Sequence, residues 1–63
     1  MAVDSTTGLL NERAAAQILG CTASALRKWR LFGRGPAYIR VGRLIRYREA
    51  DLAAFIERNR VEA

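Results

Sequence analysis

The sequence predicts a small, mainly helical domain with one β-hairpin, in the order α-α-β-β-α. Three observations predict it. Two stretches with apolar residues at helical spacing are separated by a short glycine-containing joint, an alternating apolar and basic stretch surrounds Gly42, and a third amphipathic stretch follows. The 63 residues are 51% hydrophobic, which suits one folded domain with a thin core, because a domain of this size buries only about 60% of its unfolded surface.

The first helix is expected over residues 12–19. Asn11 is a good N-cap, and Gly20 is a good C-terminal stop. Alanine is abundant here, and Ala15, Ile18 and Leu19 follow the i, i+3, i+4 spacing of one apolar face.

The second helix is expected from the cap Thr22 to about Leu31, with Gly33 and Gly35-Pro36 preventing its continuation. Only Gly20 and Cys21 separate the first helix from this cap, which is the short joint of a helix-turn-helix. The inward stripe is predicted to be Ala25, Leu26 and Trp29, and the outward residues Ser24, Arg27, Lys28 and Leu31, with Ala23 and Arg30 on the flanks.

Residues 38–47 alternate in the manner of a hairpin, and two registers are compatible with the pattern. A two-residue tip pairs Val41 with Leu44 and places Ile39 on the same face as Arg46. A three-residue tip pairs Val41 with Ile45 and Ile39 with Tyr47, so that the apolar residues share a buried face and Arg40 and Arg46 share the other. We favour the three-residue tip, with Gly42 or a neighbour at positive φ and Arg43 at the tip.

A third helix is expected over residues 49–60, with acids in its first turn and arginines in its last, as the helix dipole favours. With the hairpin as a wing, these elements make a winged helix-turn-helix over residues 9–60, preceded by a flexible N-terminus (1–8) and followed by a tail (61–63). The predicted core comprises Leu19, Leu26, Trp29, Tyr47, Leu52, Phe55 and Ile56.

The composition argues against an enzyme. The chain has no histidine and one cysteine, so it offers no parts for a catalytic triad, a disulfide or a Cys/His metal site, and we expect no cofactor, no metal and no small-molecule substrate. No apolar run is long enough to span a membrane and no signal peptide is seen, which indicates a cytoplasmic protein without a membrane partner.

Positive charge is in excess and unevenly spread. The net charge is +5, ten of the eleven bases are arginine, and no acid lies between Glu12 and Glu49. Eight bases lie uncompensated between Arg27 and Arg48. A solvated face or an acidic protein or membrane partner remains an alternative, but this pattern favours nucleic acid.

The chain resembles the excisionase (recombination directionality factor) family of small winged helix-turn-helix proteins, whose DNA-binding domain is MerR-like and AlpA-like. The resemblance covers about residues 9–60 and rests on Leu9-Leu10, Ala14-Ala15-Ala16, Leu19-Gly20, Leu26-Arg27-Lys28-Trp29-Arg30, Gly33, Gly35-Pro36, Gly42, Tyr47 and Asp51-Leu52. Members often carry an acidic residue where Ala14 stands, so a capping contact in the first helix is expected to be lost.

The resemblance implies that the second helix lies in the major groove and that the wing reaches the minor groove or backbone. It assigns Ala23, Ser24, Arg27 and Lys28 to the major groove, Thr22, Arg30 and Arg34 to phosphates, and Arg40, Arg43 and Arg46 to the wing contact. Each arginine could instead be merely solvated, and Tyr38 could be a core edge or a phosphate ligand.

The resemblance further implies a phage-encoded DNA-bending accessory protein on the DNA of a bacterial host. Copies would bind double-stranded DNA cooperatively, side by side on tandem sites, and direct an integrase toward excision. Acids of the last helix (Glu49, Asp51 and Glu57) could contact a neighbour's arginines, or could serve only their own helix dipole. A transcriptional regulator of the same fold is the alternative function, and a protein-interaction module for an acidic partner is a further one.

Overall fold

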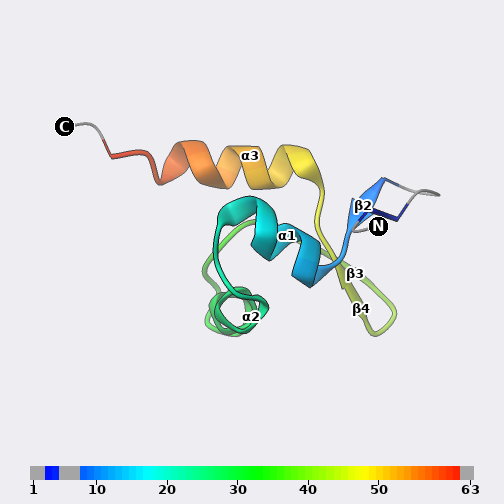
Figure 1. The fold of residues 1–63 in the computed structure, drawn as a ribbon. Helices are drawn as coiled ribbons and strands as arrows, with labels where there is room; N and C mark the ends of the chain where they lie inside the picture. The colour runs from blue at the N-terminus through cyan, green and yellow to red at the C-terminus, as the bar shows by residue number, and fades with distance from the viewer. Residues whose placement is uncertain (1–2, 5–7, 62–63) are drawn as a thin grey trace.

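The computed structural model describes residues 3–4 and 8–61, and its order of elements confirms the predicted winged helix-turn-helix (Figure 1). Helices α1 (Glu12–Leu19) and α2 (Ala23–Leu31) form the helix-turn-helix, strands β3 (Ile39–Val41) and β4 (Leu44–Arg46) form the wing, and α3 (Glu49–Arg58) packs across α1. The last helix ends two residues earlier than predicted. Among the residues that the structure describes, no helix combines the length and the apolar character that crossing a bilayer needs.

Side-chain caps and one glycine form the joint between α1 and α2. The Asn11 Oδ1 accepts a hydrogen bond from the Ala14 backbone N–H at 2.8 Å, so the cap of α1 is present although Ala14 is not acidic. Gly20 ends α1 with φ +73°, and the Thr22 hydroxyl oxygen accepts from the Ala25 N–H at 3.0 Å to begin α2. The predicted start and end of both helices are therefore confirmed.

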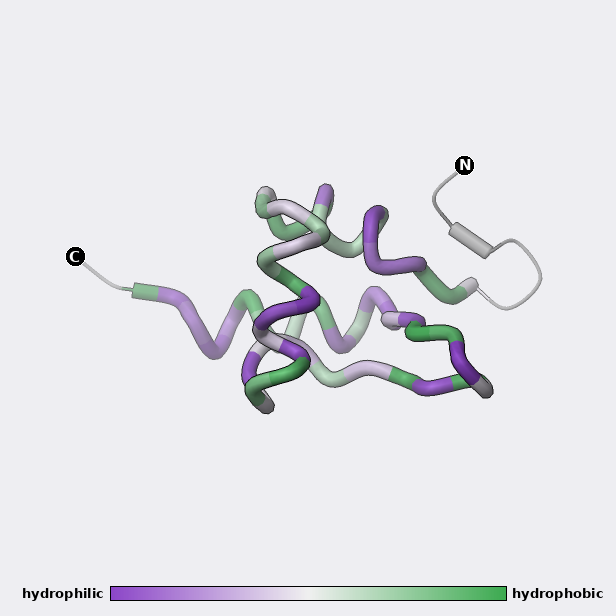
Figure 2. Tube along the Cα trace, turned by 90° about the horizontal axis from the view of Figure 1, so that it is seen from below, coloured by the Kyte–Doolittle hydropathy of each residue, from purple (hydrophilic) through white to green (hydrophobic). Residues whose placement is uncertain are grey.

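The core is small and lies where α1, α2, α3 and the base of the wing meet. Its fully buried side chains include Tyr47, Leu26 and Leu52, which the sequence placed there, and Leu19 and Trp29 pack against it. Ala15, which the sequence placed on the apolar face of the first helix, is also buried, and three further buried residues were not predicted, namely Leu10, Ala14 and Ala16. Small alanine side chains allow the other elements to approach the α1 backbone closely. Figure 2 shows how hydrophobic and hydrophilic residues alternate along the chain.

Two isoleucines expected to be buried lie at the rim instead. Ile18 is 49% exposed and Ile56 is 47% exposed, so the prediction that Ile56 belongs to the core is wrong. Both line one shallow apolar depression at the seam between α1 and α3, with Leu52 beneath them and no other described element above. Phe55 is half-buried, with its ring 5.9 Å from that of Trp29.

The favoured hairpin register is also wrong. Val41 pairs with Leu44, Arg40 with Ile45 and Ile39 with Arg46, which leaves Gly42 and Arg43 as a two-residue tip. Gly42 has φ +62° and no residue other than glycine has a positive φ in the described chain, as in a type II′ turn. A turn of this type has a backbone twist that fits the twist of the two strands, and it needs only one glycine. The shorter tip is therefore favoured, although it does not bury every apolar residue of the hairpin on one face.

The observed register assigns the residues of the wing to its two faces differently from the favoured prediction. Arg40 and Ile45 share one face, and Ile45 packs against the core. Ile39, Val41, Leu44 and Arg46 share the other face, so Arg40 and Arg46 do not lie together as predicted.

The N-terminal segment fastens the base of the wing. Leu10 and Tyr47 exchange two backbone hydrogen bonds, each 2.8 Å long, so that β2 (Leu9–Leu10) lies beside the end of the hairpin. The other edge of β2 pairs with β1 (Val3–Asp4), in a segment for which the sequence predicted no regular structure. Of the predicted flexible terminus, residues 1–2 and 5–7 lie outside the described residues, as do residues 62–63 of the predicted tail.

The two-residue turn requires a residue that tolerates a positive φ at position 42, and this requirement can be tested. We expect Gly42→Ala to lower the free energy of unfolding by about 1–2 kcal/mol, because an L-residue is strained at this φ. An added Cβ would meet no other atom within 4 Å, so the cost is conformational rather than steric. Chemical denaturation measures it, and Arg43→Ala, at the other tip position with negative φ, is the control that should change stability by less than about 0.5 kcal/mol. Equal stability of the two variants would contradict the two-residue turn.

Candidate nucleic-acid interface

The outward face of α2 is polar, basic and accessible. Thr22, Ala23, Ser24, Arg27 and Lys28 are all exposed, and all lie in the first two turns of the helix or at its cap. The Thr22 hydroxyl oxygen caps the helix, and its proton is still free to be donated outward. In the described chain no carboxylate pairs with Arg27 or Lys28, so their charge is directed at solvent.

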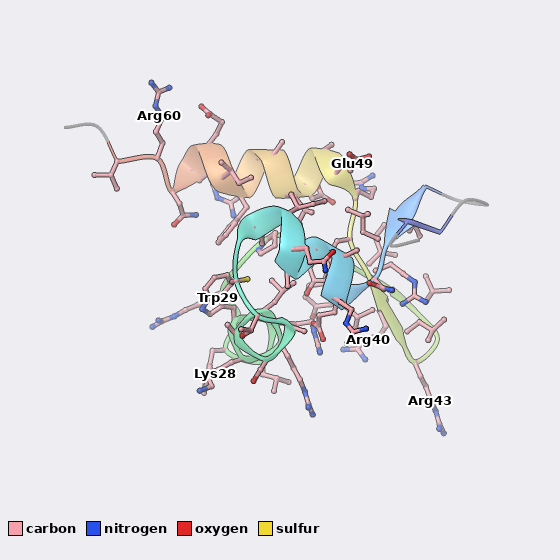
Figure 3. All side chains as sticks on the ribbon, in the orientation of Figure 1. Lys28, Trp29, Arg40, Arg43, Glu49 and Arg60 are labelled. Atoms are coloured by element: carbon pink, nitrogen blue, oxygen red, sulfur yellow. The ribbon has the colours of Figure 1, made fainter. Side chains whose placement is uncertain are left out.

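The wing adds further arginines on the same side of the molecule. Figure 3 shows Lys28 and Arg43 pointing away from the domain on the side opposite α3, with Glu49 at the start of α3 and Arg60 just beyond its end. Arg40 and Arg43 are exposed, whereas Arg46 is half-buried and its Nη1 donates to the Ile45 carbonyl at 2.8 Å. Two of the three predicted wing arginines therefore have fully accessible side chains.

A carboxylate at the start of α1 joins the second helix to the wing. The Glu12 Oε2 accepts hydrogen bonds from the Arg30 Nε at 3.1 Å and from the Tyr47 hydroxyl at 3.2 Å. The Arg30 guanidinium also lies over the Tyr38 ring, 5.8 Å from its centre, and that ring contacts Tyr47. Tyr38 is thus a partly exposed edge of this cluster, which links the end of α2, the start of α1 and the base of the hairpin.

This bridge corrects the role expected for Arg30. Its side chain is only 13% exposed and its charge is paired with Glu12, where the sequence analysis expected a phosphate contact. The hydrogen bond that Arg30 donates to Glu12 raises the pKa of Arg30 above its ordinary value. Burial, followed by the Glu12 charge and hydrogen bond, raises the pKa of Tyr47 to about 12. Arg30 therefore joins the end of α2 to the start of α1.

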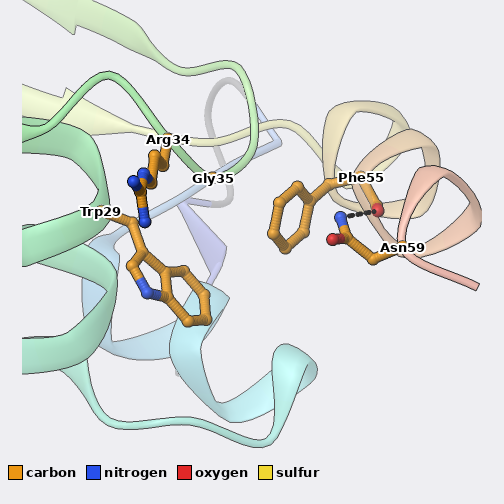
Figure 4. A pocket seen from close by; sticks show the side chains of 5 residues that line it. All are labelled: Trp29, Arg34, Gly35, Phe55 and Asn59. Atoms are coloured by element: carbon orange, nitrogen blue, oxygen red, sulfur yellow. Dashed lines mark hydrogen bonds between the residues drawn. The ribbon is translucent and has the colours of Figure 1, made fainter.

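Arg34 lies apart from the exposed basic face of α2. It is exposed and lines an open cleft of about 530 Å³ with Trp29, Gly35, Phe55 and Asn59 (Figure 4). Trp29 forms one wall of this cleft, and the Asn59 side-chain amide is occupied by a 2.8 Å hydrogen bond to the Phe55 carbonyl. The structure thus groups Arg34 with aromatic rings rather than with Arg27 and Lys28.

The comparison with known families agrees with this geometry. The sequence model of one family, described as a helix-turn-helix domain, matches residues 9–60. This chain belongs to that helix-turn-helix family. The domain is accordingly a DNA-binding one, and its partner is double-stranded DNA. Searches among curated proteins and among solved structures found no match.

The sequence analysis did not find the Glu12 bridge. The sequence pattern gave Glu12 no side-chain partner and indicated only that Tyr47 lies in the core. One signal was available, because Glu12 is the last acid before the long basic stretch and therefore the nearest partner along the chain for an arginine turned inward. Its actual partners lie 18 and 35 residues away, which no local pattern reveals.

Removing the bridging charge should destabilise the domain. We expect Glu12→Gln to lower the free energy of unfolding by about 1–3 kcal/mol, because Arg30 is left largely buried without its counter-charge. Denaturant titration measures the change. Glu57→Gln is the matched control, since Glu57 is 72% exposed and lies 3.9 Å from Arg60, and it should cost less than about 0.5 kcal/mol. A Glu12→Gln variant as stable as the control would show that the bridge does not contribute.

The raised pKa of Tyr47 predicts a loss of stability at alkaline pH. The folded chain keeps the phenol proton up to about pH 12, whereas the unfolded chain releases it near pH 10. The folded state therefore binds more protons between these values, and this stabilisation, complete below pH 10, is lost as the pH rises toward 12. Unfolding measured across this range should show the loss in the wild type and in Tyr38→Phe, and a flatter curve in Tyr47→Phe. The same slope in all three proteins would exclude Tyr47 as its source.

Proposed function

We propose that this domain is an excisionase-type accessory protein that binds tandem DNA sites, bends the DNA and directs an integrase toward excision. The observation that carries the DNA-reading part is that the basic face of α2 and the arginine-bearing wing point to one side, opposite α3. An α-helix fits the major groove, and a hairpin beside it can reach the neighbouring minor groove.

The exposed side chains divide into those placed to contact bases and those placed to contact phosphates. Arg27 can donate two hydrogen bonds to guanine O6 and N7, which is worth roughly 1–3 kcal/mol of base discrimination, and Ser24 and Lys28 flank it. Thr22 lies at the N-terminus of α2, where backbone N–H groups also favour a phosphate. Arg40 and Arg43 suit a narrow minor groove and its phosphates. Arg34 and Arg46 are secondary contacts, and Arg30 is omitted because of its bridge to Glu12.

We infer tandem binding from the short length of DNA that one copy of this interface can contact. One two-turn reading surface and one wing span a single half-site, so several copies side by side would supply the affinity and the bend. The acids of α3 lend little support to a contact through charge, because Asp51 pairs with Arg48 at 3.0 Å and Glu57 lies near Arg60. The excision role itself is supported by the resemblance to excisionases.

The test is a gel-shift and bending assay on DNA surrounding the gene, including any attachment site of a neighbouring integrase. We expect stepwise cooperative shifts, a strong bend, and an affinity that falls by roughly 4–6 decades per decade of salt for 5–7 phosphate contacts. A single shift over a promoter with little bending would indicate a transcriptional regulator instead. A negligible salt dependence would indicate a protein-interaction module.

Charge-matched variants separate reading from general attraction. We expect Arg27→Gln to weaken binding to the selected site by about 1–3 kcal/mol and to relax base preference at one position. Arg60→Gln removes the same charge beyond the end of α3 and should change affinity much less. Competition binding against a panel of single-base changes measures both effects. If both variants lost the same affinity and neither changed base preference, α2 would not be the reading helix.

A further inference from the structure

The wing carries an apolar ridge that the fold does not require. Val41 and Leu44 are the last pair before the tip, on the face opposite to Ile45, and they are 49% and 53% exposed. Cross-strand partners on one face have Cβ atoms roughly 5 Å apart, so the two side chains form one continuous surface, here named the wing ridge. Polar residues could occupy both positions without a loss of core packing, which makes two aliphatic side chains there unusual.

The surroundings of the wing ridge are basic. Arg43 forms the tip beside it and Arg40 stands on the opposite face of the same strands, while no acid lies between Glu12 and Glu49. The occupant of the ridge should therefore combine negative charge with an apolar surface. The minor groove of DNA offers both, since phosphates border walls of deoxyribose and base edges.

A second copy of the chain fits the ridge less well. The aromatic cleft between Trp29 and Phe55 is an open apolar hollow, but it is also lined by Arg34. The Arg58 guanidinium also lies over the Phe55 ring, 5.7 Å from its centre. A wing with Arg43 at its tip would bring like charges together there, which opposes this contact.

We propose that the wing ridge is an apolar wedge that enters the minor groove beside Arg43 and partly unstacks one base step. This inference rests on the proposed function and adds the element that produces the bend. Apolar side chains inserted at a base step kink a duplex toward the major groove, so a wedge on the wing bends DNA at the flank of the site that α2 reads.

The experiment compares two double variants on a duplex that the wild-type protein selects from a random-sequence pool. Val41→Thr with Leu44→Thr removes the apolar ridge but keeps strand-forming residues. Ile18→Thr with Ile56→Thr is the matched control, since these residues are equally exposed at the seam of α1 and α3. Thermal unfolding checks that both variants fold. Affinity is measured against salt, end-to-end energy transfer reports the bend, and 2-aminopurine at flanking steps reports unstacking.

We expect the ridge variant to bind roughly ten-fold more weakly, to bend the duplex less and to lose the 2-aminopurine signal, with an unchanged salt slope because no phosphate contact is lost. The control should behave as wild type. An unchanged bend and an unchanged 2-aminopurine signal in the ridge variant would overturn the wedge. A variant that binds a single site normally but loses cooperativity on tandem sites would also overturn it, because the ridge would then contact a neighbouring protein. If the wild type itself selected no duplex, the proposed function would fail first.

Discussion

The Glu12 carboxylate connects the second helix of the helix-turn-helix to the base of the wing. It accepts hydrogen bonds from Arg30 at the end of α2 and from Tyr47 at the base of the wing, so one side chain joins the two elements that we propose meet adjacent grooves. A largely buried ion pair is costly unless its geometry is good, and here the same Glu12 oxygen that pairs with Arg30 also accepts from the Tyr47 hydroxyl.

This bridge divides the basic residues into two groups. Arg30 is turned inward and neutralised, whereas Arg27, Lys28, Arg40 and Arg43 remain exposed without carboxylate partners in the described chain. We propose that the exposed group attracts phosphates. Basic residues that are alike in the sequence therefore have different surroundings in the fold, because Arg30 is paired and largely buried whereas the others face solvent.

Local signals predicted most of the helices, and long-range pairing was harder to predict. Asn11, Gly20 and Thr22 mark helix ends through contacts within four residues, so the sequence places those ends correctly. The hairpin register was mispredicted because burial of apolar residues on one face was weighted above the turn that Gly42 permits. Ile56 was wrongly assigned to the core because helical spacing shows which face of a helix is apolar. It does not show where the neighbouring element stops covering that face. The Arg30 bridge joins distant residues, and periodicity carries no information about it.

We propose that α2 and the wing form one DNA interface, with Arg30 bonded to Glu12 behind it. An NMR titration of the isotope-labelled protein with its selected duplex tests this proposal most directly. We expect amide shifts confined to residues 22–28, 34 and 40–46, with the Arg30 side-chain Nε–H resonance unchanged because it remains bonded to Glu12. Shifts centred on α3, or an Arg30 Nε–H that moves as phosphate binds, would contradict it.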